Sequence, residues 1–113
     1  MSLYNYLALA ERVVDADTIE CRIDLGFNIQ YLMHVRLKGV NAPERNTPEG
    51  KVMTQQVSEW ITKNGREFLL VTDKDKRSFT RYVGTMVALG TGGNLNDYVQ
   101  SLIDQMWRDS EII

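Results

Sequence analysis

Thr18-Ile-Glu-Cys-Arg-Ile-Asp-Leu25 alternates apolar and polar side chains along its whole length. Such alternation is typical of a strand that buries one face and exposes the other. Gly26-Phe-Asn28 interrupts the pattern, and a second alternating stretch runs from Ile29 to Lys38. Two alternating stretches joined by a short turn predict a β-hairpin. The side chains expected on its apolar face are Ile19, Cys21, Ile23, Leu25, Ile29, Tyr31, Met33, Val35 and Leu37.

Three further stretches outside the hairpin are predicted to be strands. They are Tyr6 to Val14, Arg66 to Thr72 around the apolar run Phe68-Leu-Leu-Val71, and Tyr82 to Leu89. Gly84 lies inside the last one, where a glycine is typical of a bulge or a bend in a barrel.

Two helices are expected. Thr47-Pro48-Glu49 has the capping hydroxyl, the first-turn proline and the acidic residue of a helix start, and Asn64-Gly65 ends that helix. The second helix follows the turn Gly90-Thr-Gly-Gly93. Its apolar residues recur at helical spacing, so we expect the whole stripe in the core: Leu95, Tyr98, Val99, Leu102, Ile103, Met106 and Trp107.

The element order is therefore three strands, a helix, two strands and a helix. This order predicts an α+β, mainly β fold, a five-stranded OB-type barrel with two helices. Closing the sheet removes its edges, which matters in so short a chain. At 113 residues the chain is expected to form a single domain spanning residues 1–113.

Composition narrows the function classes. The net charge is −2 and the pI about 5.3, which argues against a protein that coats duplex DNA by charge alone. Local charge still allows an enzyme with a small phosphate footprint. Cys21 is the single cysteine, so no internal disulfide forms, and its place on an apolar strand face favours a buried thiol.

No apolar run approaches the ~20 residues of a membrane helix, so no membrane partner is expected. The N-terminus lacks a basic region followed by an apolar core. We therefore expect a cytoplasmic protein, the alternative being a secreted protein whose leader is replaced by Met1-Ser-Leu3. The protein is also expected to be a monomer.

Two carboxylates and two arginines lie near the predicted strand ends: Asp17, Arg36, Glu44 and Arg81. Singly, each has a structural explanation as a turn residue or a solvated arginine. Together they suit a metal-assisted attack on a phosphodiester, in which carboxylates hold a cation and a base while arginines bind the phosphate. Pro43 would fix the backbone beside the base, Glu44.

The most basic loop runs from Lys74 to Arg81. It is either a solvated connection or a phosphate-binding loop in which Phe79 offers a surface for base stacking. Under the second interpretation, its nucleic-acid-binding residues are Lys74, Lys76, Arg77 and Phe79.

Three stretches together resemble the thermonuclease, or staphylococcal nuclease-like, family. They are Val14-Asp-Ala-Asp-Thr18, Arg36-Leu-Lys-Gly-Val-Asn-Ala-Pro-Glu44 and Phe79-Thr-Arg81. The family patterns are V-x-D-G-D-T, R-L-x-G-I-D-A-P-E and Y-G-R. Leu95-Asn96 also resembles the pair that opens the family's second helix. Order and spacing agree from about Leu7 to Met106.

The resemblance implies a calcium-dependent nuclease that cuts single-stranded DNA and RNA with little sequence preference and leaves the phosphate on the 3′ side. Asp17, the side chain of residue 41 and the backbone carbonyl of Ala42 would bind Ca²⁺. Glu44 would be the general base, and Arg36 and Arg81 would bind the phosphate and stabilise the transition state.

Departures from the family pattern support an alternative. Asn41 replaces an aspartate, which removes a negative charge while keeping an oxygen that can bind calcium. Ala16 replaces a glycine, a change that strains the turn if it requires positive φ. Phe79 replaces a tyrosine and loses its hydroxyl. The alternative is a catalytically weak or inactive OB-type module that binds single-stranded nucleic acid or a protein.

Overall fold

A computed structural model describes residues 5–73 and 81–111, and the side chains of residues 5–72 and 83–108. The strands are β1 (Asn5–Asp15), β2 (Thr18–Asp24), β3 (Gln30–Leu37), β4 (Glu67–Asp73) and β5 (Arg81–Ala88). The helices are α1 (Pro48–Asn64) and α2 (Leu95–Glu111). Each predicted strand boundary lies within one residue of the observed one.

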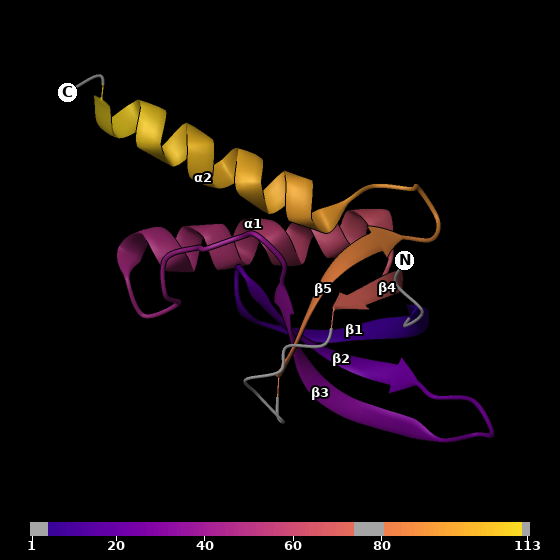
Figure 1. The fold of residues 1–113 in the computed structure, drawn as a ribbon. Coiled ribbons are helices and arrows are strands. Elements are labelled where there is room, and N and C mark those ends of the chain that lie inside the picture. The colour runs from indigo at the N-terminus through magenta and orange to yellow at the C-terminus, as the bar shows by residue number, and fades with distance from the viewer. Residues whose placement is uncertain (1–4, 74–80, 112–113) are drawn as a thin grey trace.

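The five strands close into a barrel in the order β1-β2-β3-β5-β4, with β1 beside β4 (Figure 1). β1, β2 and β3 form an antiparallel meander, and β4 pairs antiparallel with both β1 and β5. The parallel contact joins the end of β3 to the start of β5. The predicted architecture, a mainly β barrel with two helices and of OB type, is confirmed.

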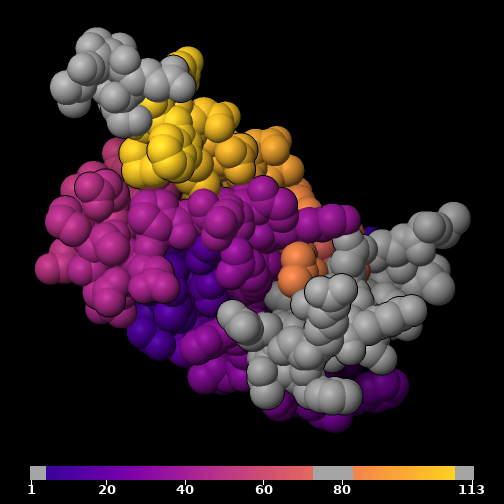
Figure 2. Space-filling model, turned by 60° about the vertical axis from the view of Figure 1, so that its left-hand side comes forward, coloured from indigo at the N-terminus to yellow at the C-terminus, as the bar shows by residue number. Residues whose placement is uncertain are grey.

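Apolar side chains from all five strands fill the barrel. The most completely buried are Ile19, Cys21, Val35, Leu37, Phe68, Leu70 and Met86. Trp60 of α1 packs between the barrel and α2. The distance between ring centroids is 6.3 Å from Trp60 to Phe68 of β4 and 5.4 Å from Trp60 to Tyr98 of α2. In Figure 2, α2 in yellow accordingly packs directly against α1.

Local signals set both helix starts. The Thr47 hydroxyl accepts a hydrogen bond from the Gly50 N–H, and Pro48 lies in the first turn, as predicted. At α2, the Asn94 side chain accepts from the Asp97 N–H. Neither helix is long and apolar enough to span a bilayer in the part of the chain described.

Asn96 joins α2 to the barrel. Its Nδ2 donates to the carbonyls of Lys38, at 3.1 Å, and Gly84, at 3.0 Å, while its Oδ1 accepts from the Met86 N–H at 3.0 Å. The side chain is buried, so these bonds replace those it would make with water. They fix the position of the segment that leaves β3.

Two expectations need correction, one for Trp107 and one for the outer end of the hairpin. Trp107 is not in the core but 62 % exposed, because the C-terminal half of α2 extends away from the barrel (Figure 1); Met106 does pack against the core. Leu25, Ile29 and Tyr31 are also exposed, because the hairpin of β2 and β3 is longer than the barrel is deep. Of the two roles predicted for Gly84, a bulge is excluded, since its pairing is continuous on both sides, and a bend in the barrel stays a prediction. Ala16 is buried and has no positive φ, so it is unstrained.

Burial raises the pKa of the Cys21 thiol from 9.0 to about 12. Its thiolate is therefore scarce at neutral pH, and the folded protein should resist labelling by iodoacetamide at pH 8 while the urea-unfolded chain labels readily. Because burial raises this pKa, the thiol contributes fully to the stability of the fold below pH 9. This contribution is lost as the pH rises to about 12. Fast labelling of the folded chain, followed by mass spectrometry, would contradict this burial.

Candidate functional site

Asp17 precedes β2 and connects it to the segment after β3. Its side chain is almost fully buried, at 5 % residue exposure, so its charge must be met by protein groups. Oδ1 accepts a hydrogen bond from the Thr18 hydroxyl at 3.1 Å, and Oδ2 accepts one from the Ala42 N–H at 3.1 Å. Asp17 therefore anchors the chain just before Glu44.

Arg36 lies near the end of β3, and three oxygens converge on its Nη2. Asp17 Oδ2 lies at 3.7 Å, and Nη2 donates to Asn41 Oδ1 at 3.3 Å and to the Val40 carbonyl at 3.5 Å. The hydrogen bonds and the ion pair that join this guanidinium to the described residues are all made by Nη2.

These oxygens have the chemistry of a site for a hard cation. A carboxylate, an amide and backbone carbonyls are the oxygen types that bind Ca²⁺, and the three that surround Nη2 meet at one place. Within residues 5–73 and 81–111, no three His, Cys, Asp or Glu side chains cluster as metal ligands. The oxygen types of these ligands are therefore those that Ca²⁺ prefers. The site has one carboxylate, and a site with two would bind Ca²⁺ more tightly.

The backbone at Glu44 is held by the start of α1. Its carbonyl accepts from the Thr47 N–H at 3.0 Å and from the Thr47 hydroxyl at 2.7 Å. The same carbonyl lies so close to the α carbon of Gly50 that a Cβ there would overlap it. Pro43 restricts the backbone on the other side of Glu44.

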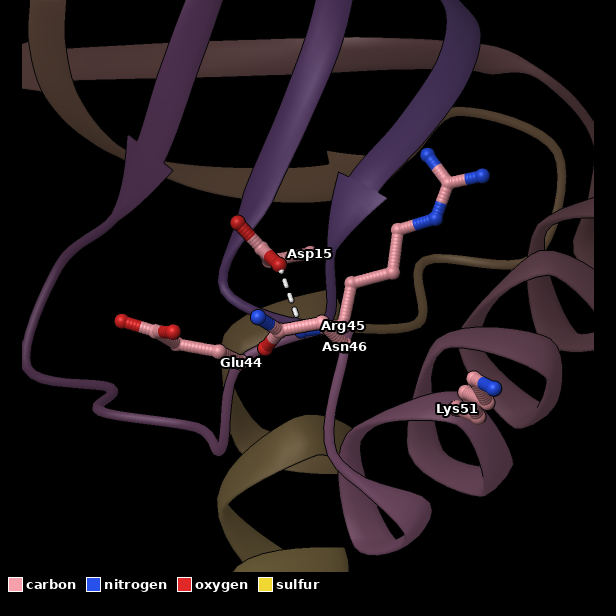
Figure 3. A pocket seen from close by; sticks show the side chains of 5 residues that line it. All are labelled: Asp15, Glu44, Arg45, Asn46 and Lys51. Atoms are coloured by element: carbon pink, nitrogen blue, oxygen red, sulfur yellow. Dashed lines mark hydrogen bonds between the residues drawn. The ribbon is translucent and has the colours of Figure 1, made fainter.

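The Glu44 carboxylate is exposed and borders an open pocket with Asp15, Arg45, Asn46 and Lys51 (Figure 3). Asp15 Oδ1 accepts from the Arg45 N–H at 2.8 Å, which ties this segment to the end of β1. In Figure 3, the Glu44 side chain points away from Arg45 and Lys51. The carboxylate is therefore open to a substrate on that side.

Charged residues also cover the outer face of the sheet beside Arg36. Glu20 Oε2 lies 3.1 Å from Arg12 Nη2 and 3.2 Å from His34 Nε2. Hydrogen bonds from Arg12 and then His34 lower the pKa of Glu20. This surface network is screened by water, so it contributes little to stability.

The structure places the backbone of Arg81 at the start of β5, paired with His34, where β5 runs parallel to β3. β5 therefore neighbours β3, the strand that carries Arg36, and the role of Arg81 as a phosphate ligand stays a prediction. Lys74, Lys76, Arg77 and Phe79 lie outside the described residues.

The structure thus brings together Asp17, Arg36, Asn41 and Ala42, with Glu44 at the neighbouring pocket. The Ala42 N–H donates to Asp17 Oδ2, and the prediction that the Ala42 carbonyl binds a cation stays a prediction. The Val40 carbonyl was missed, because a backbone oxygen leaves no signal in residue type. Arg45 and Lys51 were missed because isolated basic residues are common on any surface.

No protein-family model matches this chain, and a search among curated proteins also found no match. Function is therefore inferred from the geometry of the site.

Proposed function

We propose that the protein is a calcium-dependent phosphodiesterase that cleaves single-stranded DNA or RNA. The observation that carries the proposal is the convergence of Asp17, Asn41 and Arg36 immediately before Glu44, a carboxylate that is exposed on a backbone held from both sides. Hard-cation ligands, a phosphate-binding arginine and a positioned base are what phosphodiester hydrolysis requires.

Each residue has a role in this proposal. Asp17, Asn41 and the backbone carbonyl of Ala42 would hold the cation, which would supply charge for the phosphate in the transition state. Glu44 takes a proton from the attacking water. Arg36 binds the phosphate through Nε and Nη1, and Arg81 is the second phosphate ligand.

A substrate with a fluorophore and a quencher at its ends tests the proposal. Cleavage of the single-stranded DNA or RNA form should require calcium, stop on addition of a chelator and resume when calcium is restored. A folded protein that leaves both substrates intact at millimolar calcium would overturn it.

A second candidate is a non-cleaving module that binds single-stranded nucleic acid. It is favoured by the contacts of Arg36 with Asp17 and Asn41, which neutralise the site without a metal. Binding of a labelled oligonucleotide without cleavage, at saturating calcium, would support this function over the first.

Asn41→Asp should tighten calcium binding roughly tenfold, or ~1.4 kcal/mol. The new carboxylate also attracts Arg36, but a dication gains about twice the Coulomb energy that a guanidinium gains. Calorimetric titration measures the change. Asn46→Asp is the matched control, because it adds the same charge to a residue that contacts none of the converging oxygens; equal gains in both variants would contradict the site.

A further inference from the structure

Two basic side chains lie beside Glu44 in its pocket. Arg45 follows Glu44 directly, and Lys51 is the fourth residue of α1. Both are exposed, and both line the pocket (Figure 3). Arg45 uses its backbone N–H on Asp15, and in the part of the chain that the structure describes neither its guanidinium nor the Lys51 ammonium makes an ion pair. Neither charge is therefore explained by a structural partner there.

The backbone that carries each cation is held in place. The Arg45 N–H donates to Asp15 Oδ1 at 2.8 Å, and the Lys51 N–H donates to the Thr47 carbonyl at 2.9 Å. The Thr47 N–H and hydroxyl in turn donate to the Glu44 carbonyl. Thr47 thus joins the segment of Glu44 to the first turn of α1, so both cations start from a fixed backbone beside the proposed base.

Helix stability does not account for Lys51. A cation near the N-terminus of a helix opposes the helix dipole, which favours negative charge at that end. The side chains three and four residues further along α1, Thr54 and Gln55, are uncharged and offer Lys51 no ion pair along the helix. A bound anion would offset the unfavourable placement of this lysine.

The charges of the pocket are complementary to a phosphodiester. Its volume is about 370 Å³, within the range of sites that bind small ligands. Glu44 directs its carboxylate away from Arg45 and Lys51 (Figure 3), which leaves Asp15 as the carboxylate beside the two cations. The balance around these two cations is therefore a single positive charge, opposite to the single negative charge of one phosphodiester group.

We propose that Arg45 and Lys51 bind a second phosphate of the single strand that Glu44 cleaves. This inference rests on the proposed nuclease function for the identity of the ligand. Along the chain, Arg36 precedes Glu44, and Arg45 and Lys51 follow it, so phosphate-binding groups lie on both sides of the base. An oligonucleotide carries a phosphate at each linkage and can meet both sides at once, whereas a substrate with one phosphate meets only the first. The substrate class is therefore an oligonucleotide with at least two phosphates.

The salt dependence of binding tests the inference without cleavage. Glu44→Gln serves as the parent, because it should leave a short fluorescein-labelled oligothymidylate intact, and fluorescence anisotropy gives its affinity in calcium. Adding Arg45→Gln or Lys51→Gln should weaken binding roughly tenfold, the loss of one charge-assisted hydrogen bond. Each should also lower the slope of log affinity against log salt by about 0.7, the value for one phosphate contact on a single strand.

Lys63→Gln and Arg108→Gln are the matched controls. Each removes one positive charge from an exposed residue, in the last turn of α1 and of α2 respectively, away from the pocket. Neither should change the slope, because screening removes the effect of a distant surface charge. Slopes for Arg45→Gln and Lys51→Gln that equal those of the controls would overturn the inference, as would a parent that does not bind the strand.

Substrate length separates this inference from the nuclease function. With Glu44 intact, Arg45→Gln combined with Lys51→Gln should lower kcat/KM for an oligothymidylate at least roughly tenfold. The same variant should cleave a thymidine dinucleotide, which has one phosphate, within about twofold of the unmodified rate. Equal losses on both substrates would overturn the second phosphate site. Absence of cleavage by the unmodified protein would overturn the nuclease function instead, and the salt slopes would still decide whether Arg45 and Lys51 bind phosphate.

Discussion

Under the proposed nuclease function, Glu44→Gln should lower the rate of single-stranded DNA cleavage by on the order of 10²- to 10⁴-fold, the contribution of a positioned general base. Glutamine has nearly the same shape and keeps a carbonyl oxygen, but it cannot accept the proton of the attacking water. The fold is unaffected, because the hydrogen bonds at this position come from the backbone carbonyl of Glu44 rather than from its side chain. Initial rates with the quenched substrate, in saturating calcium, measure the loss.

Glu49→Gln is the matched control for this experiment. Glu49 is an exposed glutamate in the first turn of α1, five residues from Glu44, so the variant has the same change in net charge. Its cleavage rate should stay within about twofold of the unmodified protein, since its only loss is a screened interaction with the helix dipole. A Glu44→Gln variant that cleaves like the Glu49→Gln control would remove Glu44 from the mechanism.

Gly50→Ala destabilises the protein by roughly 1–3 kcal/mol, the range for overpacking a well-packed site. Helix propensity alone predicts the opposite, because alanine is favoured over glycine in a helix by about 1 kcal/mol. The steric term prevails because the new Cβ meets the Glu44 carbonyl, which Thr47 holds in place through two hydrogen bonds. Relief requires the segment that carries Glu44 to move.

Urea unfolding followed by circular dichroism gives the change in free energy of unfolding. Gly90→Ala is the control, because the nearest atom to its Cβ, the Asn64 carbonyl oxygen, is at an ordinary 3.6 Å and its φ is not positive. That variant should be neutral or slightly stabilising. Equal stability of the two variants would show that the start of α1 adapts without cost.

The strands were predictable because alternation is a local signal. The side chains of Ile19 and Val35 face the core as their place in the pattern predicts. Tyr31 continues the same pattern and is nevertheless exposed. Alternation identifies a face of the sheet, whereas burial depends on whether another strand lies opposite, and β5 begins beside His34 rather than beside Tyr31. Trp107 is exposed for a similar reason. It continues the apolar stripe of α2 into the part of the helix that extends beyond the barrel.

The sequence predicted which side chains meet at the site, but it did not predict which backbone groups contact them. The contacts of Arg36 with Asp17 and Asn41 join residues that the sequence had already grouped. The roles of the Val40 carbonyl and the Ala42 N–H depend on how the chain turns after β3. That turn is set by Asp17 and Asn96, which are distant in sequence, so no local pattern contains it.

Closure of the barrel has a consequence for the order of folding. Ala8 pairs with Phe68, and Val35 pairs with Tyr82, so both closing contacts join distant parts of the chain. Proteins dominated by such non-local pairs fold slowly, in milliseconds to seconds. During synthesis the meander of β1 to β3 leaves the ribosome before β4 and β5 exist, with both of its outer edges unpaired. In that interval the unpaired edges of the meander are exposed to aggregation, so the nascent chain is more vulnerable than the finished barrel.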